Sequence, residues 1–232
     1  MGVSEKWKQG PDGSFFTPEG ALVWPHEGTV VVADLHLGYE ATRARSGDHL
    51  PEWSLQDVQK RLAKLFQAMD VKRLVVAGDV TESKVAMSGR ISILKQFQDW
   101  LESQGVEAIL LAGNHDRMIH SRTAFHESYV VHGWLVHHGH QSFTTPDKGV
   151  IGQITGHLHP VIKWQGRTFR TFISSPGRVI LPAFTGDAAG LDLLAAGTLG
   201  EAPADSHCWV CSDSEVLDFG ILHNLKSKLG LS

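Results

Sequence analysis

Short apolar runs alternate with amphipathic stretches along the first half of the chain. Three runs are apolar at nearly every position: TVVVA from residue 29, RLVVA from residue 73 and VEAILLA from residue 106. Such runs are typical of strands that are buried on both faces. Because helical patterns lie between them, the order strand, helix, strand, helix, strand predicts a parallel sheet covered by helices.

Two amphipathic helices are predicted between these strands. The first covers residues 54–69, where apolar side chains recur at helical spacing. Ser54 is at the N-cap position, and Asp57 follows it by three positions. The second helix carries on one face Ile91, Leu94, Phe97 and Leu101. We expect each apolar face to pack against the sheet.

Strand patterns also dominate both ends of the chain. SFFTPEGALVW, residues 14–24, has apolar runs on both sides of a Pro-Glu-Gly turn and predicts a hairpin. From Tyr129 onwards, short runs such as WLVHH, IGQIT and RVILPAF follow closely on one another, which favours a mostly antiparallel second sheet. We therefore predict an α/β fold, a two-sheet α/β/β/α sandwich with helices outside, as a single domain over residues 1–232.

The composition adds limits to this picture. The chain has 232 residues, of which 42% are hydrophobic, enough for one well-cored domain. The sequence shows no charged segment followed by an apolar leader, and no apolar run approaches the roughly 20 residues that span a bilayer. We expect a cytoplasmic protein without a membrane partner. The two cysteines, Cys208 and Cys211, are expected to be ordinary buried thiols, because no second pair completes a zinc site.

Charge and histidine content bear on the partners. The net charge is −4, so there is no general basic field for nucleic acid, and any polyanion would have to be held locally. The chain contains 14 histidines without a His-rich tract. Since neutral imidazole is the commonest metal ligand, their positions indicate where metal chemistry is to be sought.

Polar residues directly follow five of the apolar runs. In open α/β sheets, ligands bind at the carboxyl ends of the strands. Each motif alone is as typical of a hydrogen-bonded loop as of a site, but five in this context favour a site. The candidates are Asp34 and His36 in ADLHLG, Asp79 in AGDV, Asn114, His115 and Asp116 in AGNHD, His138 and His140 in VHHGH, and His157 and His159 in TGHLHP.

These residue types suit divalent metal ions. In an extended segment, residues two apart point to one side, so Asp34/His36 and His157/His159 can each direct two donors into one cleft. Carboxylate and imidazole suit manganese, with iron or zinc as alternatives, and the lack of cysteine in the motifs argues against structural zinc. The donors are too many for one open site and suit two ions sharing a carboxylate, roughly 3.5–4 Å apart.

In this order, Asp-x-His, Gly-Asp, Gly-Asn-His-Asp, His-Gly-His and Gly-His-x-His closely resemble the motifs of the calcineurin-like metallophosphoesterases, from about residue 29 to residue 160. The segments ADLHLGYE, GHLHPVIK and VILPAFTG further resemble the small prokaryotic branch that includes the DNA-ligase-associated phosphoesterases. Many ligase-associated members lack the His-Gly-His form of the fourth motif, whereas this chain has it. The resemblance implies the same sandwich fold and a hydrolase of phosphoesters.

The resemblance also implies roles for the candidate residues. Asp34, His36 and His159 would bind a first metal ion, Asp79 would bridge, and Asn114, His138 and His157 would bind a second. His115 would contact the phosphate and protonate the leaving oxygen, with Asp116 orienting its ring. A metal-bridging hydroxide would attack the phosphorus, which is consistent with the lowered pKa of metal-bound water.

Some alternatives stay open at this stage. His138 is preferred to His140 in the fourth motif because it directly precedes Gly139, as the pattern of the family it resembles has it, while the adjacent His137 must point to the opposite side of the strand. Four arginines that follow the first and third motifs could reach a substrate phosphate, or equally form a solvated face: Arg43, Arg45, Arg117 and Arg122.

Three functions compete. The leading one is a di-metal hydrolase of phosphoesters, with diesters favoured over monoesters. The second is a nuclease component of a DNA-repair complex, in which a partner would supply DNA affinity; a homo-oligomer is also compatible with the sequence. The third is a non-catalytic metal-binding scaffold, which predicts missing ligands, whereas all the motif residues are present.

Overall fold

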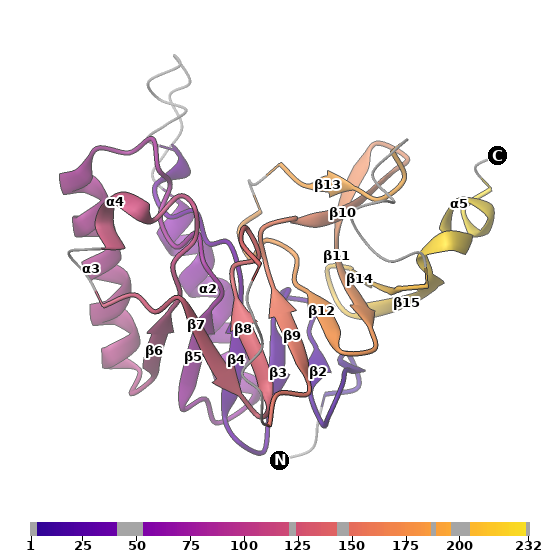
Figure 1. Ribbon diagram of the computed structural model, residues 1–232, viewed down its shortest axis with the longest axis horizontal. Helices are drawn as coiled ribbons and strands as arrows, with labels where there is room; N and C mark the ends of the chain where they lie inside the picture. The colour runs from indigo at the N-terminus through magenta and orange to yellow at the C-terminus, as the bar shows by residue number, and fades with distance from the viewer. Residues whose placement is uncertain are drawn as a thin grey trace.

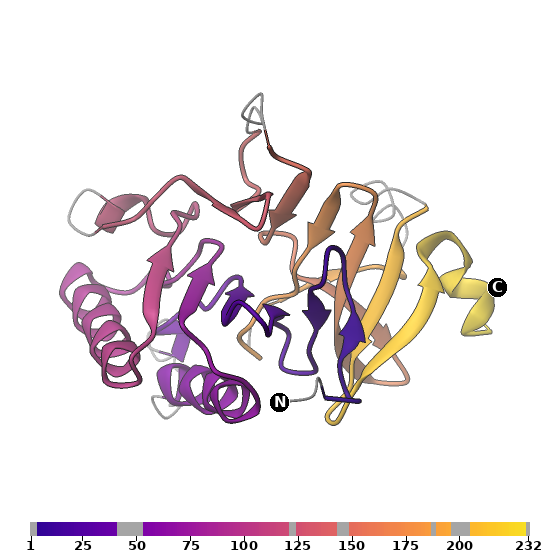
Figure 2. The ribbon, with the colours of Figure 1, turned by 90° about the horizontal axis from the view of Figure 1, so that it is seen from below.

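Two β-sheets lie face to face in the computed structural model, with helices against the outer face of the first sheet (Figures 1 and 2). The structure describes residues 4–40, 53–120, 124–142, 149–186, 189–195 and 205–230. Among these residues, none of the helices is both long and apolar enough to cross a membrane.

The first sheet contains the strands of the N-terminal half. Its order is β1-β2-β3-β4-β5-β6, and β4, β5 and β6 are parallel, as the sequence predicted. The predicted hairpin is the antiparallel pair β2 and β3. The strands are β1 (Lys8–Gln9), β2 (Phe15–Phe16), β3 (Leu22–Trp24), β4 (Thr29–Val32), β5 (Arg73–Val76) and β6 (Glu107–Leu110).

The second sheet follows in the C-terminal half. Its order is β13-β10-β11-β12-β9-β8-β7, and β14 extends it by pairing with β11 and β15. Five of its eight pairings are antiparallel, but β8, β9 and β12 run parallel to one another. The strands are β7 (Ser128–Val131), β8 (Trp134–His137), β9 (Gly152–Thr155), β10 (Pro160–Trp164), β11 (Arg167–Ser175), β12 (Arg178–Ile180), β13 (Leu191–Asp192), β14 (His207–Cys211) and β15 (Val216–Ile221).

Helices are few in the part of the chain that the structure describes. The long ones are α2 (Ser54–Ala68) and α3 (Met87–Ser103), and the short ones are α4 (Arg117–His120), the 3₁₀ helix η2 (Leu222–Asn224) and α5 (Leu225–Lys228). The predicted α/β/β/α order therefore holds with a thin fourth layer, because only η2 and α5 contribute helical residues to the cluster on the second sheet.

Alternation along the strands explains how the first sheet is buried on both faces. Val30 and Val32 of β4 belong to an apolar cluster with α2 and α3, whereas Val31 and Ala33 belong to a second cluster between the sheets. Leu74 and Val75 of β5 divide in the same way. Successive side chains point to opposite faces of a sheet, so an apolar residue at every position is what a middle layer requires.

Two details of the predicted helices are wrong. Ser54 is not the N-cap of α2, since its hydroxyl donates to Glu40 Oε1 at 2.9 Å and accepts from the backbone N–H of Gly38. In α3, Ile91 is exposed, and Arg90 is buried in the first turn instead. Arg90 can be buried because its guanidinium donates to Thr81 Oγ1 and to the carbonyl oxygen of His115.

The sequence reading also missed β14, which carries both cysteines. Cys208 and Cys211 are free and buried, as predicted, and burial raises the pKa of each thiol to about 12. A thiol with so high a pKa is protonated at neutral pH and is a poor nucleophile or metal ligand. The two cysteines are thus part of the packing of the second sheet.

Candidate metal centre

All five sequence motifs lie at the carboxyl ends of strands, on one edge of the sandwich. The motifs follow β4, β5 and β6 of the first sheet and β8 and β9 of the second. Within each sheet these strands are parallel to one another. The backbone N–H of His157 donates to Asp34 Oδ2 at 3.0 Å, which ties the loops of the two sheets together.

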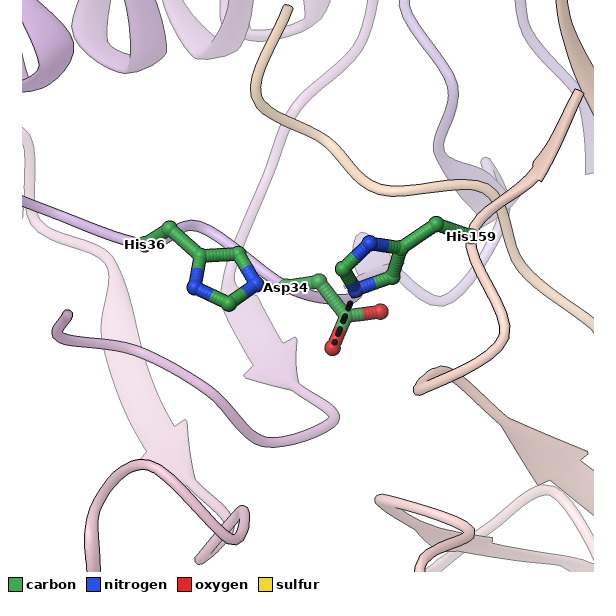
Figure 3. Close-up of side chains that lie close together, drawn as sticks. All are labelled: Asp34, His36 and His159. Carbon is green, nitrogen blue, oxygen red and sulfur yellow. Dashed lines mark ion pairs between the residues drawn. The ribbon is translucent and has the colours of Figure 1, made fainter. Parts of the chain in front are cut away.

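The first group of side chains is formed by Asp34, His36 and His159. Their donor atoms lie within 4.8 Å of one another, although His159 is 123 or more positions away in the chain. Nε2 of His159 lies 3.4 Å from Oδ1 of Asp34. A dashed line marks this pair in Figure 3. The rings of His36 and His159 meet edge to face around Asp34.

The second group surrounds His138. Its Nε2 lies 2.9 Å from Oδ1 of Asn114, 3.1 Å from Nδ1 of His157 and 3.4 Å from Oδ2 of Asp79. Asp79 lies between the two groups, because the same Oδ2 is 3.9 Å from Nε2 of His36. We call the seven side chains of both groups the donor cluster: Asp34, His36, Asp79, Asn114, His138, His157 and His159.

Unsatisfied atoms show that the first group of the donor cluster fits a metal ion. Oδ1 of Asp34, Nε2 of His36 and Nε2 of His159 are buried and make no hydrogen bond within the described chain. Buried polar atoms are normally paired, because leaving one unpaired costs roughly 1–3 kcal/mol. Donors around one ion at about 2.1 Å are separated by roughly 3–3.5 Å, which is close to the separations found here.

Backbone strain is concentrated in the same residues. Asp34, His36, Asp79, His157 and His159 have φ between 46° and 70°, and they are five of the eight non-glycine residues with positive φ in the described chain. This conformation is costly for residues with a side chain and is retained mainly at functional sites. In these loops the strained backbone aims the donors into the cluster.

At two positions only glycine leaves enough space for a neighbouring carboxylate of the donor cluster. A Cβ on Gly113 would lie 2.0 Å from Oδ1 of Asp79, and one on Gly156 would lie 2.5 Å from Oδ2 of Asp34. Neither glycine has a positive φ. Glycine is therefore needed at these positions because the carboxylates pass directly over the backbone, and only secondarily for tight turning.

Burial divides the donor cluster into a floor and a mouth. Asp34, His36, Asp79 and His138 are buried, whereas Asn114 and His159 are half-buried and His157 is exposed. Burial alone raises the pKa of Asp34, but the neighbouring His159, with His138 and His36, lowers it below its ordinary value. Asp34 is thus a carboxylate, the form that binds metal.

Glu82 is a site residue that the sequence reading missed. Its Oε1 lies 3.2 Å from Nδ1 of His115, and its Oε2 lies 3.4 Å from Nδ1 of His36. These histidines keep the pKa of Glu82 far below its ordinary value despite its burial, and the hydrogen bond to Glu82 raises the pKa of His115. The sequence feature that could have indicated Glu82 is GDVTE, where this second carboxylate follows Asp79 by three positions.

Asp116, which we expected to orient the ring of His115, has other hydrogen-bond partners in the structure. Its carboxylate is buried and accepts from the backbone N–H groups of Val80, Thr81 and Gly113 and from the Thr81 hydroxyl. Asp116 therefore holds the second and third motif loops together. The carboxylate beside the ring of His115 is that of Glu82. Because an ionised carboxylate only accepts hydrogen bonds, Nδ1 of His115 must donate to it.

The alternatives in the fourth motif and the arginines are placed as follows. His140 is half-buried beside His138, with 5.1 Å between the ring centroids, and its Nε2 contacts the Gln141 amide. His137 points away, with Nε2 3.3 Å from Oε1 of Gln153. Arg117 is exposed on α4. The other three arginines lie outside the described residues: Arg43, Arg45 and Arg122.

A two-sheet sandwich with acidic and imidazole donors at its strand ends is the architecture of a metal-dependent hydrolase. The family model of the calcineurin-like phosphoesterases matches residues 29–145, which is just over half of the chain. The chain belongs to this family and is a metal-dependent phosphoesterase.

Among solved structures, the chain is similar to a nuclease of Pseudomonas putida called MPE. The two share 22% sequence identity, with a TM-score of 0.62 over 88% of this chain and 94% of that chain. This likeness supports the fold. A comparison with curated proteins found no match.

Proposed function

We propose that this phosphoesterase is a di-metal enzyme that hydrolyses phosphodiesters in preference to phosphomonoesters. The observation that supports it is the donor cluster, in which two groups of side chains share Asp79 and the first group carries buried atoms without hydrogen bonds. Asp34, His36 and His159 would hold one ion, and Asn114, His138 and His157 the other. Manganese is the preferred metal, with iron or zinc as alternatives.

When bound, such ions supply positive charge opposite the phosphoester and activate a water molecule for in-line attack, the hydroxide chemistry expected from the sequence. The chain supplies the proton for the leaving group. Nδ1 of His115 donates to Glu82, so its other ring nitrogen, Nε2, remains for the substrate. Because Glu82 favours the imidazolium form, His115 has a proton to donate to the leaving oxygen.

The decisive experiment compares two nitrophenyl substrates on manganese-loaded protein. We expect about two manganese ions per chain by elemental analysis, and faster turnover of bis-p-nitrophenyl phosphate than of p-nitrophenyl phosphate. A saturating content of one ion per chain would contradict the dinuclear proposal. Faster monoester turnover would overturn the diester preference, and two bound ions without any turnover would favour the non-catalytic scaffold.

A nuclease is the second candidate. It is supported by the similarity to a protein described as a nuclease and by basic residues beside the donor cluster. In this version the protein is a ligase-associated phosphoesterase that works in the cytoplasm with a DNA-repair partner, and the two free thiols suit that compartment. Nicking of a supercoiled plasmid or cleavage of single-stranded DNA would separate it from a small-molecule diesterase.

A further inference from the structure

A cavity of about 500 Å³ opens directly beside the donor cluster. It lies between α2, strands β10 and β11, and the segments around residues 18–19 and 183–186. His159 lines this cavity and also belongs to the first donor group. A substrate whose reacting phosphate lies at the donor cluster can therefore extend past His159 into the cavity.

The cavity is locally basic in an acidic protein. Its lining includes five lysines or arginines and three aspartates or glutamates, whereas the whole chain has a net charge of −4. Lys60, Arg61 and Lys64 come from α2, and Arg167 and Arg170 come from β11. We call these five residues and the space between them the basic cavity.

Much of this positive charge is not neutralised by the protein. Lys60 and Lys64 form no ion pair with a described residue, and Arg167 pairs with Asp213 only at 3.4 Å on the surface. The guanidinium of Arg170 donates to the backbone carbonyl oxygens of Pro18, Glu19 and Phe184. Burial, and the positive charge of Arg61, lower the pKa of Arg170 to about 10, so it keeps its charge at neutral pH.

Arg61 provides an independent sign that a ligand is missing. Its Nε donates to Asp57 at 2.9 Å, but its Nη1 is buried and has no hydrogen-bond partner in the described chain. A buried guanidinium N–H is normally satisfied, because an unpaired one bears the full cost of desolvation. Phosphate oxygens, like those of a carboxylate, match the N–H donors of a guanidinium.

We propose that the basic cavity is a second anion site, which binds a phosphate group of the substrate other than the one that reacts. Arg61 contacts this phosphate, and Lys60 and Lys64 attract it. The substrate class is then a phosphodiester that carries a further phosphate, as neighbouring units of a nucleotide chain do. This inference rests on the proposed phosphodiesterase function.

The test uses two esters with the same scissile bond and the same leaving group. One is thymidine 5′-(p-nitrophenyl phosphate), and the other carries an added 3′-phosphate. For the manganese-loaded protein we expect kcat/KM to be about tenfold higher for the ester with the added phosphate, because its KM is lower. A tenfold gain is what one charge-assisted contact provides. Equal values of kcat/KM for the two esters would overturn the second site.

Charge variants locate the effect. Lys60→Gln/Lys64→Gln and, separately, Arg61→Gln should abolish the advantage of the added phosphate and leave turnover of bis-p-nitrophenyl phosphate unchanged. The matched control is Lys72→Gln/Lys95→Gln, which removes two exposed lysines outside the cavity and should keep the advantage. An advantage that survives all the cavity variants would place the phosphate elsewhere.

A binding measurement keeps this test separate from the proposed function. Calorimetry with thymidine 3′,5′-bisphosphate should give a Kd about tenfold weaker for Lys60→Gln/Lys64→Gln than for the control variant. If neither ester is hydrolysed, the phosphodiesterase proposal fails, and the Kd values still decide the cavity. Equal Kd values, or no measurable binding to the unaltered protein, would overturn the second site.

Discussion

His159 belongs to the donor cluster and also lines the basic cavity. These two regions differ in burial, in charge and in the elements that supply their side chains. The donor cluster has a buried floor of acids and imidazoles, supplied by loops at adjacent strand ends. The basic cavity has lysines and arginines from a helix and a strand that are more than 100 positions apart. The first region is suited to chemistry on one phosphate, and the second to holding another.

The difference teaches how rigidity is distributed. Donors at strand ends are held by strained backbone and by contacts with one another, so their positions are set before any ligand binds. Lys60 and Lys64 are exposed on α2 and can change rotamer. We therefore expect changes in the donor cluster to affect turnover and metal content, and changes in the basic cavity to affect only the choice of substrate.

The largest effect is expected from Asp79→Asn. Asp79 faces His36 on one side and His138 on the other, so neutralising it removes negative charge from both donor groups at once. We expect manganese content to fall to one ion per chain or fewer, and turnover of all diesters to fall to background. Asp99→Asn, an exposed change on α3, is the matched control. Retention of two ions and normal turnover would assign the bridge to another residue.

The next effect separates chemistry from metal binding within the donor region. His115→Gln should retain both metal ions but lose about 10²–10⁴-fold in turnover of alkyl diesters, the usual contribution of a general acid. Nitrophenyl diesters should lose much less, because nitrophenolate leaves without a proton. Turnover of both series and elemental analysis check this prediction. Equal losses on the two series would mean that His115 positions the phosphate and is not the acid.

A smaller effect distinguishes Glu82 from Asp116. Glu82→Gln keeps an acceptor for Nδ1 of His115 but removes the charge that favours the imidazolium, so alkyl diester turnover should fall roughly 10–100-fold. Asp116→Asn should instead lower stability, by about 1–3 kcal/mol, because backbone N–H donors of two loops lose an acceptor. Leaving-group series and thermal unfolding of both variants check this. The opposite pattern would restore Asp116 as the residue that orients His115.

The same contrast explains what the sequence could predict. Most strands and both long helices could be predicted because apolar periodicity is a local property, and the candidate donors were proposed from their strand-end position, as in TVVVADLH. Glu82 was missed because its partner His115 lies 33 positions away. The burial of Arg90 was missed because a charged residue in a helix is expected to be exposed, and only the fold places Thr81 and the His115 carbonyl beside it. Residues 60–64, with the sequence KRLAK, have the pattern of the polar side of a helix, and only the fold brings β11 opposite them.

The smallest expected effect is that of salt, and it probes the two regions within one protein. Raising the KCl concentration from about 0.05 M to about 0.5 M screens exposed charges strongly and buried ones little. The advantage of the ester with the added 3′-phosphate should therefore shrink several-fold, since Lys60 and Lys64 are exposed. Turnover of bis-p-nitrophenyl phosphate, which involves the donor cluster with its buried floor, should change less than twofold.

Lys60→Gln/Lys64→Gln should remove the salt dependence of the ratio between the two thymidine esters. A ratio that is insensitive to salt in the unaltered protein would mean that the added phosphate is held by fixed, desolvated contacts such as those of Arg61 and Arg170, and the lysines would lose their part in the second site.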